Sequence, residues 1–429
     1  MQTRDIPAVW QAIGPKEWPS APTRMTFSRL RDIEACPRRW ALSSADYPEV
    51  WQRSGYPPRL QVPSAVGSIV HLALERIVKA LARGGCSSMQ DPKTSAVLRQ
   101  LGGYTQTINE CTRDILAAEK DNPRTRRVEE WFEREIHSRM GEIRERVQIF
   151  LAPMRLQPLS SARGTREKGT HERDALGLGS HPEVLLKAAK LGWLGVADLI
   201  NISPGECEIV EFKTGRPSED HPFQLRVYSL LWALDADLNP NARLASRLTL
   251  CYPTANHDVT PPSADELELF GREVGDRTRA AIESVSTRPP EARPTFDNCE
   301  YCGVRHLCDD YWEVSTGHHP LEEGQMDRRF IDLDLTITDR HGPSSWDAVV
   351  EVSRAVQAGK RLVLQTKPSE FDLRPGDRVR VLDVHLMTAG DDEFQPAVVT
   401  TMVVSEVFFV PTGTRKHARG PSDHLKEGS

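Results

Sequence analysis

Residues 195–215 read GVADLINISPGECEIVEFKTG and carry the strongest structural signal in the chain. Two apolar, β-like runs at 194–202 and 207–212 flank the turn residues Ser-Pro-Gly at 203–205. Strand-forming runs separated by a short turn of this kind predict a β-hairpin.

The hairpin carries two acids and a lysine. Asp198 lies within the first run and Glu211 within the second, both among apolar neighbours, where an unpaired carboxylate is costly. Because side chains alternate along a strand, Glu211 and Lys213 are expected on one face and Phe212 on the other. Two carboxylates that can hold a divalent cation, beside a positive charge, are typical of metal-dependent phosphodiester cleavage.

The 429 residues suffice for two or three domains with sizeable cores. The net charge of −6 does not itself indicate nucleic-acid binding, although local basic patches can contact phosphates. No apolar run approaches the roughly 18 residues of a membrane span, and the N-terminus lacks the apolar core of a signal peptide. We therefore expect a cytoplasmic protein that contacts no membrane.

Helical periodicity is clearest over 64–83, where apolar residues recur every three or four positions until Gly84-Gly85 ends the pattern. A short helix is expected to begin at Ser28, as its cap, and to end at Pro37. Further helices are expected at 107–119, 125–150, 221–236 and 264–286, strands at 183–212 and 248–252, and irregular segments at 1–24, 41–63 and 160–181.

After about residue 325 the sequence changes to β runs separated by turn residues, which predicts a separate small β domain over 325–410. Its size and strand count suit an OB-like or PUA-like barrel, a kind that often binds single strands. Because it holds few aromatic residues besides Phe371, Phe408 and Phe409, a protein-docking role is an equal alternative. Residues 411–429 are expected to form a polar tail.

Other polar residues stand where they could join the hairpin acids. His71 lies on the long helix, and Glu183 lies near the start of a strand that leads to the hairpin. Gln224 and Tyr228 follow the hairpin, one helical turn apart. Ordinary structural roles are the alternatives, since His71 could pair with Glu75 and Tyr228 could be a core aromatic.

The eight cysteines fall into two groups. Since a reducing cytoplasm disfavours disulfides, four scattered cysteines are expected to be buried apolar residues: Cys86, Cys111, Cys207 and Cys251. The segment 299–308, CEYCGVRHLC, has the spacing C-x2-C-x5-C and leaves one tetrahedral position open. His306 could fill it in a zinc site, or Cys36 could complete four thiolates, which suit zinc or an iron–sulfur cluster.

Several motifs occur in a fixed order: GxxxH at 67–71, Glu183, GxxD at 195–198, EFKTG at 211–215 and QLRVY at 224–228. This ordered set resembles the PD-(D/E)XK nuclease superfamily, in its RecB-like branch, over roughly 25–312. That branch includes CRISPR-associated adaptation nucleases and the nuclease domains of helicase–nucleases. The resemblance implies an α/β fold with a restriction-endonuclease-like mixed sheet core flanked by helices, in a nuclease domain over 25–315.

The resemblance also implies a metal site for Mg²⁺ or Mn²⁺, and a histidine ligand suits Mn²⁺ better. The implied ligands are His71, Asp198, Glu211 and the carbonyl of Phe212.

Catalytic roles follow from the same resemblance. Lys213 would orient the attacking water or stabilise the transition state, and Gln224 and Tyr228 would steady Lys213 and the DNA backbone. Glu183 would be a further catalytic acid. Two acids of the preceding charged loop, at 167 and 172, could take its place.

Members of the branch with an iron staple carry one cysteine after a short N-terminal helix and three after the nuclease core. The spacing from Ser28 to Cys36-Pro37 and the segment 299–308 match both halves. The resemblance therefore favours a [4Fe–4S] cluster that joins the two ends of the domain, with zinc as the alternative. Its ligands would be Cys36, Cys299, Cys302 and Cys308.

We therefore expect a metal-dependent DNA nuclease that acts on single-stranded DNA or DNA ends, in DNA repair, recombination or phage defence. The sequence has no Walker-A pattern, so any unwinding would need a helicase or other defence or repair subunit. The alternative is a catalytically quiet nucleic-acid-binding or scaffold subunit of such a complex, but the intact Asp198, Glu211 and Lys213 set favours the enzyme. Phosphate contacts are expected from Arg38, Arg39, Arg216 and Arg226.

Overall fold

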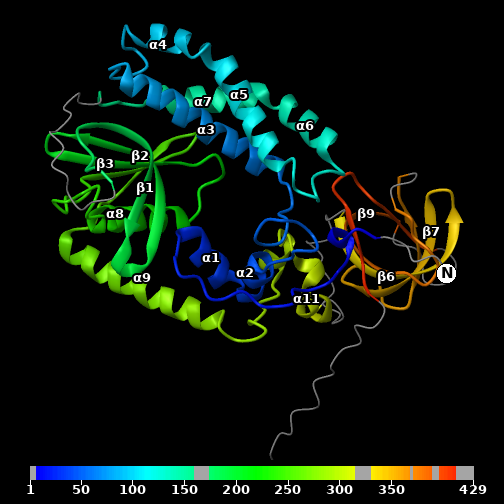
Figure 1. Ribbon diagram of the computed structural model, residues 1–429. Helices are drawn as coiled ribbons and strands as arrows, with labels where there is room; N and C mark the ends of the chain where they lie inside the picture. Colours follow the sequence, from blue (N-terminus) through cyan, green and yellow to red (C-terminus); the bar gives the residue numbers. More distant parts are fainter. Residues whose placement is uncertain (1–5, 159–172, 315–329, 368–370, 389–395, 412–429) are drawn as a thin grey trace, which may run out of the picture. The chain divides into compact units, whose positions relative to one another are not determined.

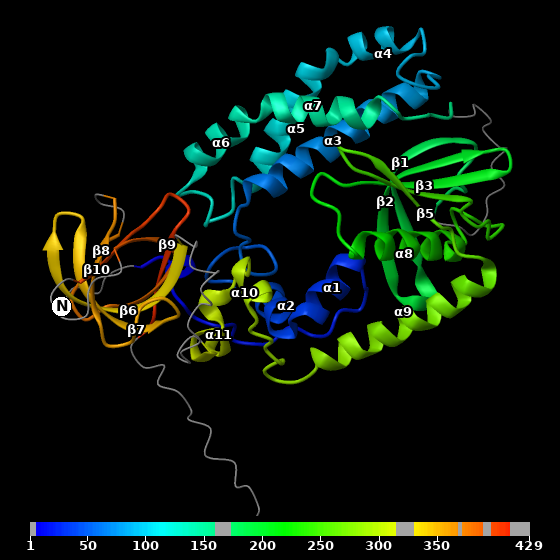
Figure 2. The ribbon, with the colours of Figure 1, turned by 180° about the vertical axis from the view of Figure 1, so that it is seen from behind.

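The computed structural model describes residues 6–158, 173–314, 330–367, 371–388 and 396–411, and the chain divides into two compact units (Figure 1, Figure 2). The larger unit comprises Glu17–Asp46 and Arg53–Arg293. The smaller unit comprises Met1–Lys16, Tyr47–Gln52 and Pro294–Ser429.

A five-stranded mixed sheet forms the centre of the larger unit, in the order β1-β2-β3-β4-β5. β2 and β3 pair antiparallel around a turn at Pro204 and Gly205, which confirms the predicted hairpin. β3 and β4 run parallel, and helix α8 provides the crossover that a parallel pair requires. The strands are β1 (Gly179–Ala188), β2 (Trp193–Ser203), β3 (Glu206–Phe212), β4 (Arg247–Cys251) and β5 (Asn256–Val259).

Helices cover both faces of this sheet (Figure 1, Figure 2). α3 packs with α5 and α7 on one face, where Val210 and Phe212 point, whereas α1, α8 and α9 pack on the other, where Ile209 points. This alternation along β3 confirms the expected α/β fold with a mixed sheet between helices. The helices are α1 (Phe27–Ala35), α2 (Pro37–Ser44), α3 (Val62–Arg83), α4 (Thr94–Gln100), α5 (Gly103–Glu119), α6 (Glu129–Ser138), α7 (Met140–Leu151), α8 (Asp220–Leu234) and α9 (Ala264–Ser284), with a 3-10 turn η2 (Ala189–Leu191).

Three helix ends differ from the sequence-based expectation. α1 is capped by Thr26 rather than Ser28, because the Thr26 hydroxyl accepts a backbone N–H three residues later. Pro37 opens α2 as well as ending α1, since proline is tolerated in a first turn, where its missing N–H has no helical partner. α3 starts two residues early for the same reason, with Pro63 in its first turn.

Other boundaries also needed correction. The single helix expected at 125–150 is two helices, α6 and α7, which meet at Arg139. Residues 41–44, expected to be irregular, belong to α2, and the short elements α4 and β5 are not predicted. Most of the loop expected at 160–181 falls on residues outside those described, and its last residues begin β1.

The smaller unit contains a β-barrel. β10 pairs parallel with β8 and antiparallel with β9, which closes a ring through β10-β8-β7-β6-β9, and β11 pairs with β9. This confirms the small C-terminal barrel-like domain, whose strands are β6 (Phe330–Gly342), β7 (Ser345–Ser353), β8 (Arg361–Gln365), β9 (Arg378–Thr388), β10 (Ala397–Thr400) and β11 (Glu406–Phe409).

Two further segments belong to this smaller unit. Near the N-terminus the turn η1 (Ala8–Trp10) precedes Ala12, whose N–H donates to the carbonyl of Phe409 on β11. The cysteine segment forms α10 (Phe296–Glu300), η3 (Arg305–Leu307) and α11 (Asp309–Val314). The guanidinium of Arg305, 3% exposed, contacts Asp332 at 2.6 Å and Asp383 at 2.8 Å. The cysteine segment is thus tied to β6 and β9, although the sequence groups it with the nuclease domain.

The described residues include no helix long and apolar enough to cross a membrane. The four scattered cysteines are free and buried, as expected: Cys86, Cys111, Cys207 and Cys251. Burial raises the thiol pKa of Cys111 to about 11 and that of Cys207 to about 12, so these side chains are neutral and apolar at pH 7.

Candidate active site

The register of the sheet places three carboxylates in one row. The β1–β2 pairs on either side of Glu183 keep one register, so Glu183 lies opposite Asp198. The β2–β3 register then places Asp198 opposite Glu211. Neighbouring strands lie about 4.8 Å apart. Three acids this close disfavour one another's ionisation unless a cation or protons neutralise them.

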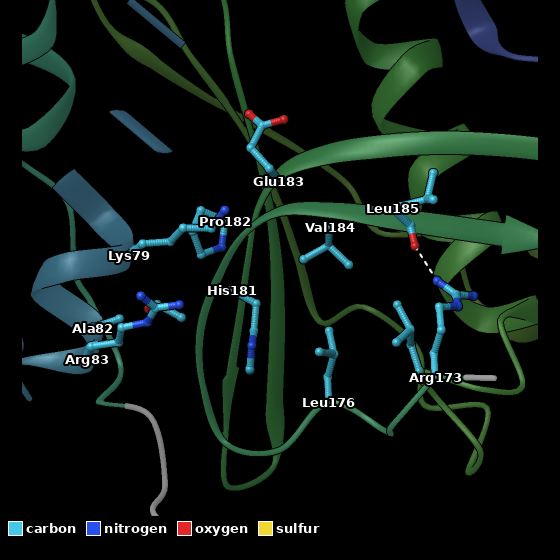
Figure 3. A pocket seen from close by; sticks show the side chains of 12 residues that line it. Lys79, Ala82, Arg83, Arg173, Leu176, His181, Pro182, Glu183, Val184 and Leu185 are labelled. Atoms are coloured by element: carbon cyan, nitrogen blue, oxygen red, sulfur yellow. Dashed lines mark hydrogen bonds between the residues drawn. The ribbon is translucent and has the colours of Figure 1, made fainter. Parts of the chain in front are cut away.

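Glu183 has an unusual backbone conformation. Its φ is +51°, in the left-handed region that a non-glycine residue rarely adopts, and strained backbone of this kind is enriched at active sites. Figure 3 shows its carboxylate pointing away from the side chains of His181 and Leu176. One ligand atom each from Glu183, Asp198 and His71 on α3 lie within 4.8 Å of one another, a spacing that suits one metal ion.

His71 pairs with the acid row. Its Nδ1 lies 3.2 Å from Oδ1 of Asp198, whereas Glu75, its alternative partner on the helix, contacts Lys79. Burial alone would lower the pKa of His71, but the hydrogen bond and charge of Asp198, with Glu211 and Glu183, raise it overall. His71 is therefore held beside carboxylates by charge, and a metal cation would compete with its proton.

Glu211 is the most buried acid of the row, at 4% exposure. Its Oε1 accepts hydrogen bonds from Lys213 Nζ at 2.8 Å and from Gln224 Nε2 at 2.9 Å. Its Oε2 is buried without a hydrogen-bond partner among the described residues. Burial and the charge of Asp198 raise the pKa of Glu211 to about 8, and burial raises that of Glu183 to about 7. A buried carboxylate oxygen that lacks a hydrogen-bond partner among the described residues, next to acids with raised pKa values, suits the binding of a divalent cation.

A second network fixes the lysine. Lys213 Nζ also donates to Oε1 of Gln224 at 2.7 Å, and Gln224 Nε2 donates to the Tyr228 hydroxyl at 2.8 Å. Gly195 on β2 makes room for this arrangement, because a Cβ there would lie 2.8 Å from the Tyr228 ring. The lysine is therefore held by groups from β3 and α8, with its amine beside the acid row.

Backbone contacts hold the hairpin end in place. The N–H of Phe212 donates to Oδ2 of Asp198 at 2.6 Å, and the Phe212 ring packs 5.4 Å from that of Phe150. Gly67 approaches Thr214 so closely that a Cβ would lie 3.0 Å from its hydroxyl. Gly67, the first residue of the GxxxH motif, therefore leaves room for Thr214, which a larger side chain would crowd. The Phe212 carbonyl remains a predicted ligand.

The expected phosphate contacts need one correction. Arg38 is buried, its Nε donates to the carbonyl of Pro290 at 2.7 Å, and its guanidinium lies over the Trp18 ring, so it is structural. Arg39 contacts Asp32. Arg216 and Arg226 are exposed. The alternative acids at 167 and 172 lie outside the described residues.

The candidate cluster cysteines belong to different units. Cys36 caps α2, and its Sγ accepts the backbone N–H groups of Arg39 and Arg293, each at 3.4 Å. The His306 ring stacks on Phe408 at 3.7 Å. The other three cysteines are buried in the smaller unit: Cys299, Cys302 and Cys308.

Sequence reasoning did not identify two cations near the site. Lys79 and Arg83 lie on α3 at successive intervals of four residues after His71 and Glu75, which together form a polar series along the helix. Such a series faces one side of a helix and drifts slowly around it. The four-residue spacing of these polar side chains could have identified Lys79 and Arg83 from the sequence.

Comparison with known proteins agrees with this geometry. Residues 24–309, about two thirds of the chain, match the model of the PD-(D/E)XK nuclease superfamily. No curated protein matches the chain. The crystal structure of SSO0001 matches with 19% identity over 44% of this chain and 81% of that one, but its TM-score of 0.22 is too low to relate the folds. The family match, with the acids on adjoining strands and the lysine directly after β3, shows that the chain belongs to the PD-(D/E)XK nuclease superfamily.

Proposed function

We propose that this protein is a metal-dependent nuclease that hydrolyses phosphodiester bonds of DNA, on single strands or at ends. The observation that carries the proposal is the buried Oε2 of Glu211, which has no hydrogen-bond partner in the described part of the chain and lies beside the acids of the same row. A structural salt bridge would have satisfied this oxygen, whereas a metal site leaves it free for the ion.

The residues divide into two groups by what they can do. His71, Asp198 and Glu211 would hold Mg²⁺ or Mn²⁺, with Glu183 as a further acid and the Phe212 carbonyl as a further ligand. Mn²⁺ is favoured because an imidazole is among the donors. When bound, the cation would polarise the scissile phosphate and make hydroxide available at neutral pH.

Lys213 would supply positive charge where negative charge develops during cleavage. Gln224 keeps the amine in place through its 2.7 Å contact, and Tyr228 in turn holds Gln224 through the Nε2–hydroxyl bond. Such preorganisation matters because a charge that need not reorient during the reaction stabilises the transition state more.

We also propose a [4Fe–4S] cluster in the RecB-like manner, with zinc as the alternative. The two N–H groups that point at Cys36 Sγ support it, because N–H···S bonds are common around cluster thiolates. Arg293, one of these donors, lies only six residues before Cys299. Iron and sulfide analysis with a visible spectrum of the purified protein decides between the two, since zinc is colourless.

The cellular setting is a proposal from the family resemblance. A helicase or another repair or defence subunit would supply unwinding, and the process would be DNA repair, recombination or phage defence in the cytoplasm. The barrel, OB-like or PUA-like in size, would bind the strand or dock a partner. The acid row and lysine network favour the enzyme over a catalytically quiet scaffold.

End-labelled single-stranded and duplex DNA, incubated with Mn²⁺ or Mg²⁺, tests the nuclease proposal. Wild type should cleave and Lys213→Ala should cleave at least about a hundredfold more slowly, while Lys190→Ala, an exposed lysine on η2, should match wild type. DNA binding without cleavage by wild type under either metal would favour the scaffold. Equal cleavage by wild type and Lys213→Ala would refute the assigned site.

A further inference from the structure

A cavity of about 360 Å³ opens directly beside Glu183, between α3 and β1 (Figure 3). Its volume falls at the lower end of the range for ligand pockets, about 300–1,000 Å³. Because Glu183 lines the cavity while its carboxylate joins His71 and Asp198, the cavity adjoins the proposed metal site. A molecule in it would therefore lie next to the bond that is cut.

One wall of the cavity is apolar. Leu176, Val184 and Leu238 line it, and the His181 ring stands among them. His181 is anchored through Nε2 to the carbonyl of Gly177 at 2.9 Å. A planar ring held in this way among aliphatic neighbours suits the flat face of a nucleobase.

Three cations line the cavity, and Figure 3 shows Lys79 and Arg83 on one side and Arg173 on the other, beside Leu176. Arg173 is already neutralised, because its Nη2 contacts both carboxylate oxygens of Asp235, at 2.9 and 2.7 Å. Lys79 contacts Glu75 on its own helix. Arg83 is exposed and forms no hydrogen bond or ion pair with any residue in the described ranges, and in Figure 3 it lies on the same side as Lys79. A guanidinium without a carboxylate partner, at the rim of such a cavity, suits a phosphate.

We propose that this cavity binds one unpaired nucleotide of the DNA strand next to the scissile phosphate, with its phosphate against Arg83 and its base against His181 and Val184. The inference rests on the proposed nuclease function and adds to it a binding subsite for one nucleotide of the strand. Contact of a base face with His181 and Val184 requires a base that is neither paired nor stacked, so the site selects single strands or frayed ends. Leu176 then controls the depth of the subsite.

Binding of a fluorescein-labelled (dT)8 strand to the full-length protein in EDTA, across a series of KCl concentrations, tests the proposal without any cleavage. Arg83→Gln should weaken binding on the order of tenfold and make the log–log salt slope shallower by about 0.7, the value for one phosphate contact on a single strand. Leu176→Trp, which fills the cavity, should weaken binding without changing the slope. Arg113→Gln, an exposed arginine on α5 outside the cavity, is the matched control and should change neither.

Two results would overturn the subsite. One is an Arg83→Gln variant with the affinity and salt slope of Arg113→Gln. The other is a Leu176→Trp variant that loses affinity equally for (dT)8 and for a blunt eight-base-pair duplex. Hydrolysis of bis(4-nitrophenyl) phosphate by wild type with Mn²⁺ tests the metal site separately. Its absence, together with Arg83-dependent strand binding, would refute the nuclease proposal and support the subsite.

Discussion

Replacement of Glu211 by glutamine should stabilise the metal-free protein, and this gain should grow with pH. Burial and the charge of Asp198 raise the pKa of Glu211 from 4.5 to about 8, so the folded protein holds this proton more tightly than the unfolded chain. The stabilisation that this proton contributes is fully present below pH 4.5 and is lost progressively as the pH rises toward 8. Glutamine has nearly the same shape and carries no ionisable proton, so it avoids this loss.

The size of the effect follows from the two pKa values. Deprotonating Glu211 lowers the folding stability of wild type by about 2 kcal/mol at pH 6 and by about 4 kcal/mol at pH 8, relative to acid pH. The stability difference between Glu211→Gln and wild type should therefore widen by about 2 kcal/mol between these pH values. A divalent cation should narrow this difference at both pH values, because saturation to 100 times Kd adds about 2.7 kcal/mol to the state that binds it.

Urea denaturation of both proteins in EDTA, at pH 6 and pH 8, measures this difference. Glu268→Gln, an exposed glutamate on α9, is the matched control and should show no pH-dependent gain. Repeating the titration with Mn²⁺ should stabilise wild type more than Glu211→Gln. If the two proteins keep a constant stability difference from pH 6 to pH 8, the pKa of Glu211 is not raised in the way that its burial indicates.

Three further substitutions test other parts of the structure. Lys213→Ala should lower kcat about 10²–10³-fold while leaving Mn²⁺ binding intact, as steady-state kinetics and metal titration would show; a lost metal affinity would contradict its assigned role. Gly195→Ala should destabilise the protein by about 1–3 kcal/mol in thermal denaturation and displace Tyr228. Gly275→Ala on α9 is the control, because this glycine faces open space, and it should stabilise the protein by up to about 1 kcal/mol. Arg305→Met should cost about 3 kcal/mol of barrel stability in urea, because the partly buried Asp332 and Asp383 lose their partner; a neutral effect would show that the network is dispensable.

The hairpin and its acids could be predicted because their signals are local. Alternating apolar residues on both sides of a Pro-Gly turn specify β2 and β3, and the register then brings Asp198 and Glu211 together. The left-handed backbone of Glu183 could not be predicted in this way, because an ordinary strand residue gives no local signal for it. Its conformation is set by the tertiary structure.

Long-range contacts explain the other differences. The bonds from Gln224 to Glu211 and Lys213 join residues more than ten positions apart, and spacing along one helix shows only that Gln224 and Tyr228 share a face. The structural role of Arg38 depends on a carbonyl 252 residues away, so its sequence context indicates a surface charge instead. Short elements such as α4 and β5 have too few residues for a clear period.

The hydrogen bond between the Phe212 amide and Asp198 makes this amide a spectroscopic reporter. One oxygen of Asp198 contacts His71 and the other accepts the Phe212 N–H. Binding of a proton or a cation to this carboxylate therefore alters the polarisation of that N–H. The amide is buried with its strand, and its nitrogen can be labelled without changing a side chain. Its nuclear magnetic resonance shift therefore provides a direct readout of the electrostatic state at the centre of the molecule, in the absence of any substrate.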